Sequence, residues 1–292
     1  MNILVDCVQT GSIVLKHVDV DLVVTLRPWT AWRHKLSGYV NHAKYCRKKK
    51  IRVYYPQKFD LSGKRDLKMF QKWKPDLLMV FGWQRIIPDE IIKTAKVAVG
   101  NHGSWKYLPF GRGHSPINWA LIKDKKKFYS HLFYLEPGVD SGDIIDVKKF
   151  PINTQDTCDS LYKKNGMMLS SMLQTNWDNI KNRKPGIKQL GVPTYLPKRI
   201  PEDGLLTIDM STKQMYNKVR ALAKPYPGAF IENKSKHIIR IWKASPFGLN
   251  FNKRKAGEIY QFQDGQILLF TKDSSLLITE WSLEHKGGRN NG

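Results

Sequence analysis

Two segments of the chain carry residue types that can move protons near neutral pH. His102 follows an apolar run, in a Gly/Ser turn at residues 101–104, and Asp140 lies in the glycine-rich loop of residues 138–142. An imidazole titrates close to neutral pH, and a carboxylate within hydrogen-bond distance orients the ring and favours its protonated form. We therefore expect His102 to carry a proton and Asp140 to hold it in place.

Composition limits the class of protein that positions this pair. The 292 residues are 41% hydrophobic and 25% charged, as in a globular protein, and the net charge is +24. Such a field favours anionic ligands, including nucleic acid, nucleotide sugars or a polyglutamylated cofactor; a lysine-rich composition that only serves solubility is the alternative. No apolar run is long enough for a membrane span and no secretory signal is seen, so we expect a cytoplasmic protein without membrane partners. The three cysteines, Cys7, Cys46 and Cys158, match no zinc or disulfide pattern, and no metal is expected.

Strand and helix patterns alternate in the first half of the chain. Strands are expected at 2–8, 21–26, 52–55 and 76–81, with helices at 36–50, 64–73 and 89–94. This alternation predicts a Rossmann-like parallel sheet with helices on its faces. A fifth apolar segment, 96–100, leads to His102, and ligands of such sheets gather at the carboxyl ends of the strands.

The second half of the chain predicts a change of architecture. A helix is expected at 112–123, strands at 131–135 and 143–150, and a long helix at 156–181 whose methionines fill the core. Proline, glycine and basic residues then give a linker composition. A helix at 211–223 and short strands after it predict a small, mainly β, OB-like barrel. We expect an α/β domain at 1–184, a linker at 185–204 and the β-barrel domain at 205–292.

The motifs around His102 and Asp140 resemble the 10-formyltetrahydrofolate-dependent formyltransferases, which include sugar N-formyltransferases and methionyl-tRNA formyltransferases. The family pattern Asn-x-His, Ser or Thr, Leu-Pro, Arg-Gly-x-x-Pro and Asp-x-Gly is matched here by residues 102–116 and 140–142. The loop 81–88 and the segments 219–222 and 225–230 extend the resemblance over nearly the whole chain. It implies a catalytic N-terminal domain that uses 10-formyltetrahydrofolate as formyl donor.

The resemblance also implies roles for individual residues. His102 and Asp140 would be catalytic, with Asn101 as the donor to the oxyanion. The folate would lie against Trp83, Arg85, Ile86, Ile87, Glu136, Val139 and Asp140, and the acceptor would meet Ser104, Arg112 and His114.

Three departures from the family pattern concern these roles. The family places its Asn two residues before the His, where this chain has Gly100, and Asn101 is the neighbouring candidate. Two extra residues separate His102 from Pro109. His114 stands where some sugar-modifying members carry Arg.

The sequence is compatible with three functions. The runs 81–83, 111–119 and 225–230 look closer to sugar-modifying relatives, which favours transfer to a nucleotide-linked amino sugar. The net charge and basic linker suit a methionyl-tRNA formyltransferase, although the C-terminal domain is the less basic part. A non-catalytic nucleic-acid-binding protein would use the β-barrel aromatics for stacking, but it leaves the His102 and Asp140 motifs without a role. The oligomeric state is open, with a homodimer as one option.

Overall fold

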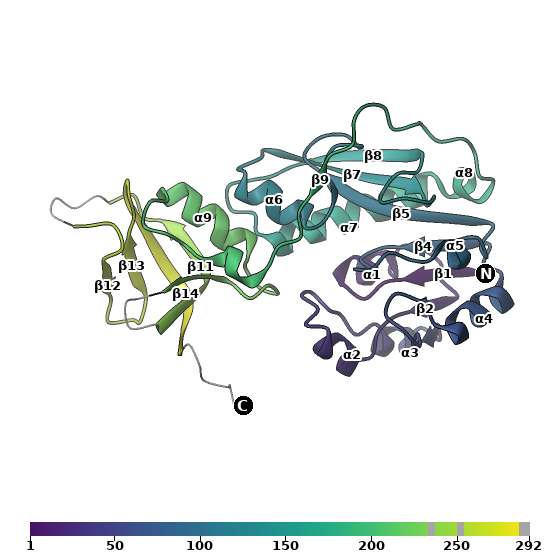
Figure 1. Ribbon diagram of the computed structural model, residues 1–292, viewed down its shortest axis with the longest axis horizontal. Helices are drawn as coiled ribbons and strands as arrows, with labels where there is room; N and C mark the ends of the chain where they lie inside the picture. The colour runs from purple at the N-terminus through teal and green to yellow at the C-terminus, as the bar shows by residue number, and fades with distance from the viewer. Residues whose placement is uncertain (233–236, 250–253, 286–292) are drawn as a thin grey trace. The chain divides into compact units, whose positions relative to one another are not determined.

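The aliphatic runs of the first half form a seven-stranded sheet. In the computed structural model, which describes residues 1–232, 237–249 and 254–285, these strands pair in the order β3-β2-β1-β4-β5-β7-β8 (Figure 1). Strands β1 to β5 run parallel, and β7 is antiparallel to both of its neighbours. The predicted Rossmann-like class is confirmed. The bounds are β1 Asn2–Val5, β2 Leu22–Val24, β3 Arg52–Tyr54, β4 Leu77–Val80, β5 Val97–Ser104, β7 Lys127–Tyr134 and β8 Ile144–Pro151.

Helices connect the parallel strands, but between β2 and β3 they differ from the expected positions. The helix expected at 36–50 is confined to α3 (Ala43–Lys48), and the helix α2 (Pro28–Arg33), which was not expected, precedes it. Pro28 starts α2, since a proline fits the first helical position, and Gly38 takes a positive φ of 76° in the connection between the two helices. The bounds are α1 Gln9–Val14, α2 Pro28–Arg33, α3 Ala43–Lys48, α4 Lys64–Trp73, α5 Asp89–Ile92, α6 Pro116–Ile122, α7 Cys158–Thr175 and α8 Trp177–Lys181.

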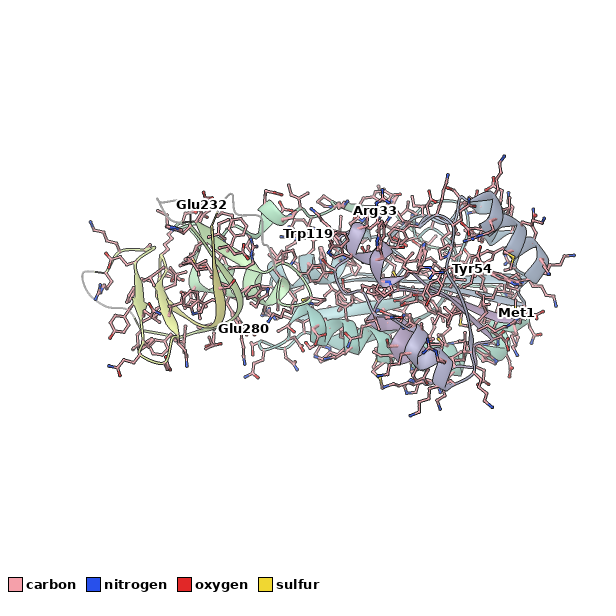
Figure 2. The ribbon with its side chains drawn as sticks, turned by 90° about the horizontal axis from the view of Figure 1, so that it is seen from below. Met1, Arg33, Tyr54, Trp119, Glu232 and Glu280 are labelled. Carbon is pink, nitrogen blue, oxygen red and sulfur yellow. The ribbon has the colours of Figure 1, made fainter. Side chains whose placement is uncertain are left out.

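The chain divides into two compact units that do not follow sequence order. The first unit holds residues 1–116, 127–151 and 161–197, and the second holds 117–126, 152–160 and 198–292. Within the first unit, Met1 and Arg33 lie at opposite ends (Figure 2). Met1 precedes β1 and Arg33 closes the helix after β2, so these ends are the amino and carboxyl edges of the parallel strands.

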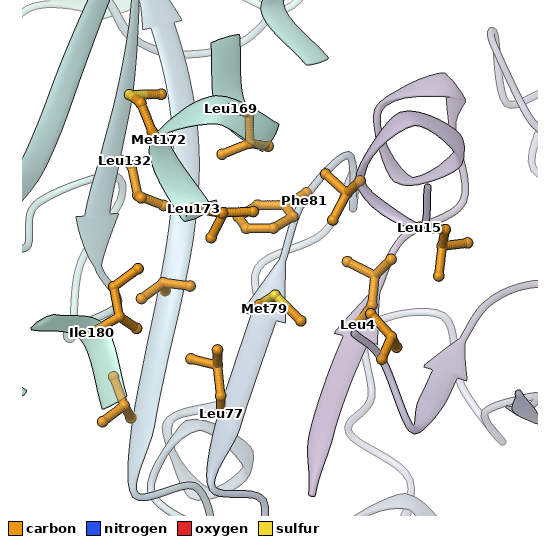
Figure 3. Close-up of a cluster of buried hydrophobic side chains, with 14 of the residues drawn as sticks. Leu4, Leu15, Leu77, Met79, Phe81, Leu132, Leu169, Met172, Leu173 and Ile180 are labelled. Atoms are coloured by element: carbon orange, nitrogen blue, oxygen red, sulfur yellow. The ribbon is translucent and has the colours of Figure 1, made fainter. Parts of the chain in front are cut away.

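One core cluster of the first unit lies between the sheet and α7. Leu169, Met172 and Leu173 share one face of α7 and cluster with Met79 and Phe81 of the β4 region (Figure 3). All five side chains are fully buried. The helical spacing therefore marks a core face, and Met172 fills it as expected.

The second unit is a helix on an antiparallel sheet. Ser211 starts helix α9 (Thr212–Ala221), because its hydroxyl accepts the backbone N–H of Gln214 in a capping box. The sheet order is β10-β11-β14-β13-β12, and over the described residues β10 and β12 are its two edges. The mainly β character of this unit is confirmed. The bounds are β10 Ala229–Glu232, β11 His237–Pro246, β12 Ile259–Gln261, β13 Ile267–Phe270 and β14 Ser275–His285.

Candidate active site

Strand β5 carries His102 beyond the end of its parallel neighbour. The last pair between β4 and β5 joins Val80 to Gly100, whereas β5 continues to residue 104 beside β7. His102 therefore lies at the carboxyl edge of the sheet, where the sequence places it. Its side chain is 8% exposed, so the ring is nearly shielded from bulk water.

Both ring nitrogens of His102 face oxygen acceptors. Nδ1 lies 3.3 Å from Oδ2 of Asp140, and Nε2 lies 2.7 Å from the carbonyl oxygen of Gly111. The carbonyl oxygen of Gly111 can only accept, so Nε2 carries the proton in this hydrogen bond, and the Asp140 carboxylate lies within ion-pair distance of Nδ1. The arrangement fixes the ring through Nδ1 and leaves the proton at Nε2 as the one that can be passed on.

The Asp140 loop has a backbone that fixes its carboxylate. Asp140 takes a positive φ of 49°, and its Oδ2 also accepts the N–H of Gly113 at 3.2 Å. A side chain at Gly142 would place Cβ 1.8 Å from the carbonyl oxygen of Tyr134. Only glycine fits there, which holds the loop against β7.

A segment that the sequence assigns to the linker ties the two catalytic loops together. We call residues 187–197 the strap. Gln189 Nε2 donates to the carbonyl oxygens of Asp140 and Gly142, each at 2.8 Å, and its Oε1 accepts Nη2 of Arg112 at 2.7 Å. Thr194 Oγ1 accepts the N–H of Gly111 at 2.9 Å. One amide thus connects the loop that holds Asp140 to the loop that holds Gly111.

Backbone pairing holds both ends of the strap. Its short strand β9 (Tyr195–Leu196) runs parallel to β6 (Arg112–Gly113). At the other end, Ile187 exchanges both backbone hydrogen bonds with Ile144 at 2.7 and 2.8 Å. Sequence reasoning missed Gln189 and Thr194, because a linker composition carries no periodic signal for long-range contacts.

His131 supports the backbone under His102. It is the direct partner of His102 between β5 and β7, and its Nδ1–H donates to the His102 carbonyl oxygen at 3.2 Å. Its Nε2 accepts the N–H of Leu108 at 3.3 Å. Burial lowers the pKa of His131 to about 4, so the ring is neutral at pH 7. The sequence leaves His131 as a structural residue, and the structure makes it a brace for the motif.

Asn101 is not brought to His102, which corrects the expectation that it donates to an oxyanion. Its Nδ2 donates to Ser130 Oγ at 3.0 Å and to the His131 carbonyl oxygen at 2.9 Å, and its Oδ1 accepts Nδ2 of Asn165. Both amide protons are engaged. Neighbouring residues of a strand point to opposite faces, so Asn101 and His102 cannot face one ligand.

The residues expected to meet the acceptor occupy different environments. Ser104 is fully buried, and its Oγ accepts the N–H of Lys106 at 3.5 Å, so it braces the loop and is shielded from ligands. Arg112 is 9% exposed and binds Gln189, while its Nε has no hydrogen-bond partner among the described residues. His114 is exposed.

The loops expected to hold a folate expose apolar and polar groups side by side. Ile86 is 76% exposed and Val139 is 37% exposed, whereas Ile87 packs into the core of the first unit and is excluded from side-chain contact with a ligand. Glu136 and Arg85 are also exposed. Trp83 Nε1 is a buried donor without a partner among the described residues. Exposed apolar side chains with a few polar donors fit a flat heterocyclic ligand such as a reduced folate.

A buried ion pair at the end of β1 was not expected. Asp6 Oδ1 lies 2.9 Å from Nε2 of His42 and accepts the N–H of Val8 at 2.7 Å. Burial raises the pKa of Asp6. Oδ2 of Asp6 faces Gly82, where a Cβ would come within 2.7 Å of it. The pair packs the loops after β1 and β4 closely together.

The comparisons with known proteins show the family of the chain. Residues 6–173 match the family described as "Formyl transferase", and residues 199–288 match its C-terminal domain. The chain belongs to the formyl transferase family. Within this family, the bifunctional polymyxin resistance protein ArnA of Wigglesworthia glossinidia brevipalpis is 34% identical over 237 residues. That match covers 79% of this chain, but the chain spans only 34% of that relative.

Two further formyl transferases differ in acceptor. The methionyl-tRNA formyltransferase of Lactobacillus gasseri is 30% identical over 246 residues, 81% of this chain and 76% of that protein. WlaRD, a sugar 3N-formyl transferase solved in the presence of dTDP and 5-N-formyl-THF, superposes with a TM-score of 0.66 at 16% identity. The superposition covers 96% of this chain and 97% of the WlaRD chain. The fold is therefore shared by relatives with different acceptors.

The described residues contain no candidate membrane-spanning helix and no candidate metal-binding cluster. None of their helices has both the length and the apolar character needed to cross a bilayer. Within the same residues, no group of three or more His, Cys, Asp or Glu side chains is placed to hold a metal ion.

Proposed function

We propose that the protein transfers a formyl group from 10-formyltetrahydrofolate to the amine of a nucleotide-linked amino sugar. The contact of His102 Nδ1 with Asp140 Oδ2, in a chain of the formyl transferase family, carries this proposal. When bound, 10-formyltetrahydrofolate supplies an activated formyl carbon. The exposed residues Arg85, Ile86 and Val139 would hold it.

The protein's own groups have separable tasks in this reaction. Asp140 orients the ring of His102 through the contact with Nδ1, and the proton at Nε2 is the one that can move. In the transfer complex this proton would leave the Gly111 carbonyl oxygen, stabilise negative charge that develops on the formyl oxygen, and then pass to the departing nitrogen. The attacking amine, which must lose a proton as its nitrogen bonds to the formyl carbon, would return one to Nε2 of His102. With Asn101 turned away, His102 itself is the candidate donor to that oxygen.

Transfer to methionyl-tRNA is the second candidate. Methionyl-tRNA formyltransferase relatives at 27% and 30% identity, each spanning more than two thirds of the relative, favour it. We place the sugar first because the solved sugar N-formyl transferase WlaRD matches 96% of the chain and the runs 81–83 and 111–119 look closer to sugar-modifying relatives. A cytoplasmic location belongs to the same proposal.

Turnover assays test the proposal and separate the acceptors. Protein with 10-formyltetrahydrofolate and a panel of dTDP- and UDP-linked amino sugars should release tetrahydrofolate with at least one sugar. His102→Ala and Asp140→Ala should each lower kcat by at least about 100-fold, which is the size of effect expected when a group that shuttles protons is lost. Release with methionyl-tRNA alone would transfer the function to tRNA, and wild-type rates in both variants would refute the mechanism.

A further inference from the structure

An exposed aromatic and basic surface lies on helix α2, outside the site described above. We call Arg27, Trp29, Trp32, Arg33 and Lys35 the α2 surface. Trp29 is 61% exposed and Trp32 is 78% exposed, and the guanidinium of Arg33 lies 5.3 Å from the Trp29 ring centre. One exposed tryptophan is ordinary, but two on a six-residue helix leave a large unpartnered apolar area that marks a contact site.

A hollow adjoins these side chains. It is a shallow, open depression with a volume of about 520 Å³. Pro28, Trp32, Leu36 and Tyr39 line it with apolar and aromatic surface, and Arg33 and Lys35 line it with charge. A ligand with a flat ring and a negative group would satisfy both kinds of wall.

The charged residues near the α2 surface in the sequence are all basic. Residues 22–59 contain no Asp or Glu. The remaining cations of this stretch include the run Arg47–Lys50 at the end of α3, which precedes β3 and so lies at the amino edge of the sheet. The carboxyl edge near α2 holds the three cations of the α2 surface together with Arg85, and Lys58 and Arg65 follow the carboxyl end of β3. The three cations of the α2 surface are enough to contact two phosphates.

Aromatic contacts connect the α2 surface to the loop expected to hold the folate. His34 lies 5.2 Å from Phe59, and Phe59 lies 5.1 Å from Trp83, between ring centres. Arg85 covers the Phe59 ring at 4.5 Å, and Gln84 Nε2 donates to the Ser37 carbonyl oxygen at 3.3 Å. The surface and that loop are therefore parts of one continuous edge.

Sheet order gives the separation between this surface and His102. Strand β2, which leads to α2, is three positions from β5 in the order β2-β1-β4-β5. At the usual spacing of neighbouring strands, these two strands lie ~14 Å apart. An extended nucleoside diphosphate sugar spans a comparable length, so its base could lie on α2 while its amine reaches His102.

We infer that the α2 surface binds the nucleoside diphosphate part of the acceptor. The base stacks on Trp32 in the hollow, and Arg33, Lys35 and Arg27 bind the two phosphates. This assignment rests on the proposed function for the identity of the acceptor, but the binding of a free nucleoside diphosphate does not require transfer to occur.

Free dTDP and UDP, titrated calorimetrically into the full chain without folate or sugar, test the inference. Trp32→Ala and Arg33→Ala should each weaken binding at least about tenfold, the usual loss for a stacked base or a phosphate contact. Lys181→Ala is the matched control, because Lys181 lies 5.3 Å from the Trp177 ring centre with the same four-residue spacing on α8. It should leave the Kd unchanged. In turnover assays, the two test variants should raise the KM for the sugar and spare kcat and the KM for the folate.

Other outcomes would overturn the inference or the proposed function. If neither nucleotide binds the wild-type chain, or both test variants bind as the wild type does with unchanged circular dichroism, the inference is overturned. Loss of methionyl-tRNA or polyglutamylated folate binding, with nucleotide binding intact, would also overturn it and give the surface to that ligand. Nucleotide binding that depends on Trp32 and Arg33, with no amino sugar formylated, would uphold the inference and refute the proposed function.

Discussion

Gln189 offers a sharp test of how the catalytic loops are held. Gln189→Ala removes two hydrogen bonds to carbonyl oxygens and one from the Arg112 guanidinium. Neutral hydrogen bonds contribute ~1 kcal/mol each and charged ones ~2 kcal/mol, so the strap and the Asp140 loop together lose roughly 2–4 kcal/mol of mutual stabilisation. We expect kcat to fall between about tenfold and 100-fold, because Asp140 then samples positions away from His102.

Two further variants separate the contacts of Gln189. Gln189→Glu keeps an acceptor for Arg112 but presents a carboxylate to two carbonyl oxygens, so it should also lose kcat. Lys188→Ala is the matched control, since Lys188 is the exposed neighbour on the same strap. Steady-state formyl transfer gives kcat and KM for each chain. A Gln189→Ala enzyme with kcat within twofold of wild type, and with unchanged circular dichroism, would refute the positioning role.

Two other predictions concern the supports of the site. The pKa of His131 falls from 6.5 in the unfolded chain to about 4, so its contribution to stability is complete above pH 6.5 and is lost as the pH falls towards 4. The free energy of unfolding of the wild type, relative to His131→Asn, should therefore drop by roughly 2 kcal/mol between pH 7 and pH 4.5 in urea titrations; a constant difference would contradict this. Gly142→Ala should abolish transfer, because its Cβ would overlap the Tyr134 carbonyl oxygen, whereas Ser141→Ala, in the same loop, should stay active. Equal activities of these two variants would count against the loop geometry.

Most helices and strands could be predicted from local sequence patterns, and the wrong predictions also have local causes. Apolar runs and helical spacing predicted the parallel sheet, the core face of α7 and the helix α9. The short helix α2 was missed because its two tryptophans face solvent and give no amphipathic pattern. Ending the fifth strand at residue 100 hid the alternation that turns Asn101 away from His102.

The site was predictable only where its residues lie in contiguous motifs. His102 and Asp140 each belong to a glycine-rich segment with a recognisable pattern, and the structure places them 3.3 Å apart. Gln189 acts through contacts with residues 47 and 49 positions away, which no local pattern encodes. The Asp6–His42 pair likewise depends on burial, which the isolated residue types do not reveal.

The interleaving of the two units affects how such proteins can be recombined. Asn118 Nδ2 donates to the Ala221 carbonyl oxygen at 2.6 Å, and Arg220 Nη1 donates to the carbonyl oxygens of Asn153 and Asp156 at 3.1 and 3.0 Å. These bonds anchor the end of α9 to peptides that precede residue 161 in the sequence. A chimera spliced near residue 198 would pair α9 with foreign versions of residues 117–126 and 152–160. Exchange of the second unit between relatives therefore requires these two insertions to be exchanged together with residues 198–292.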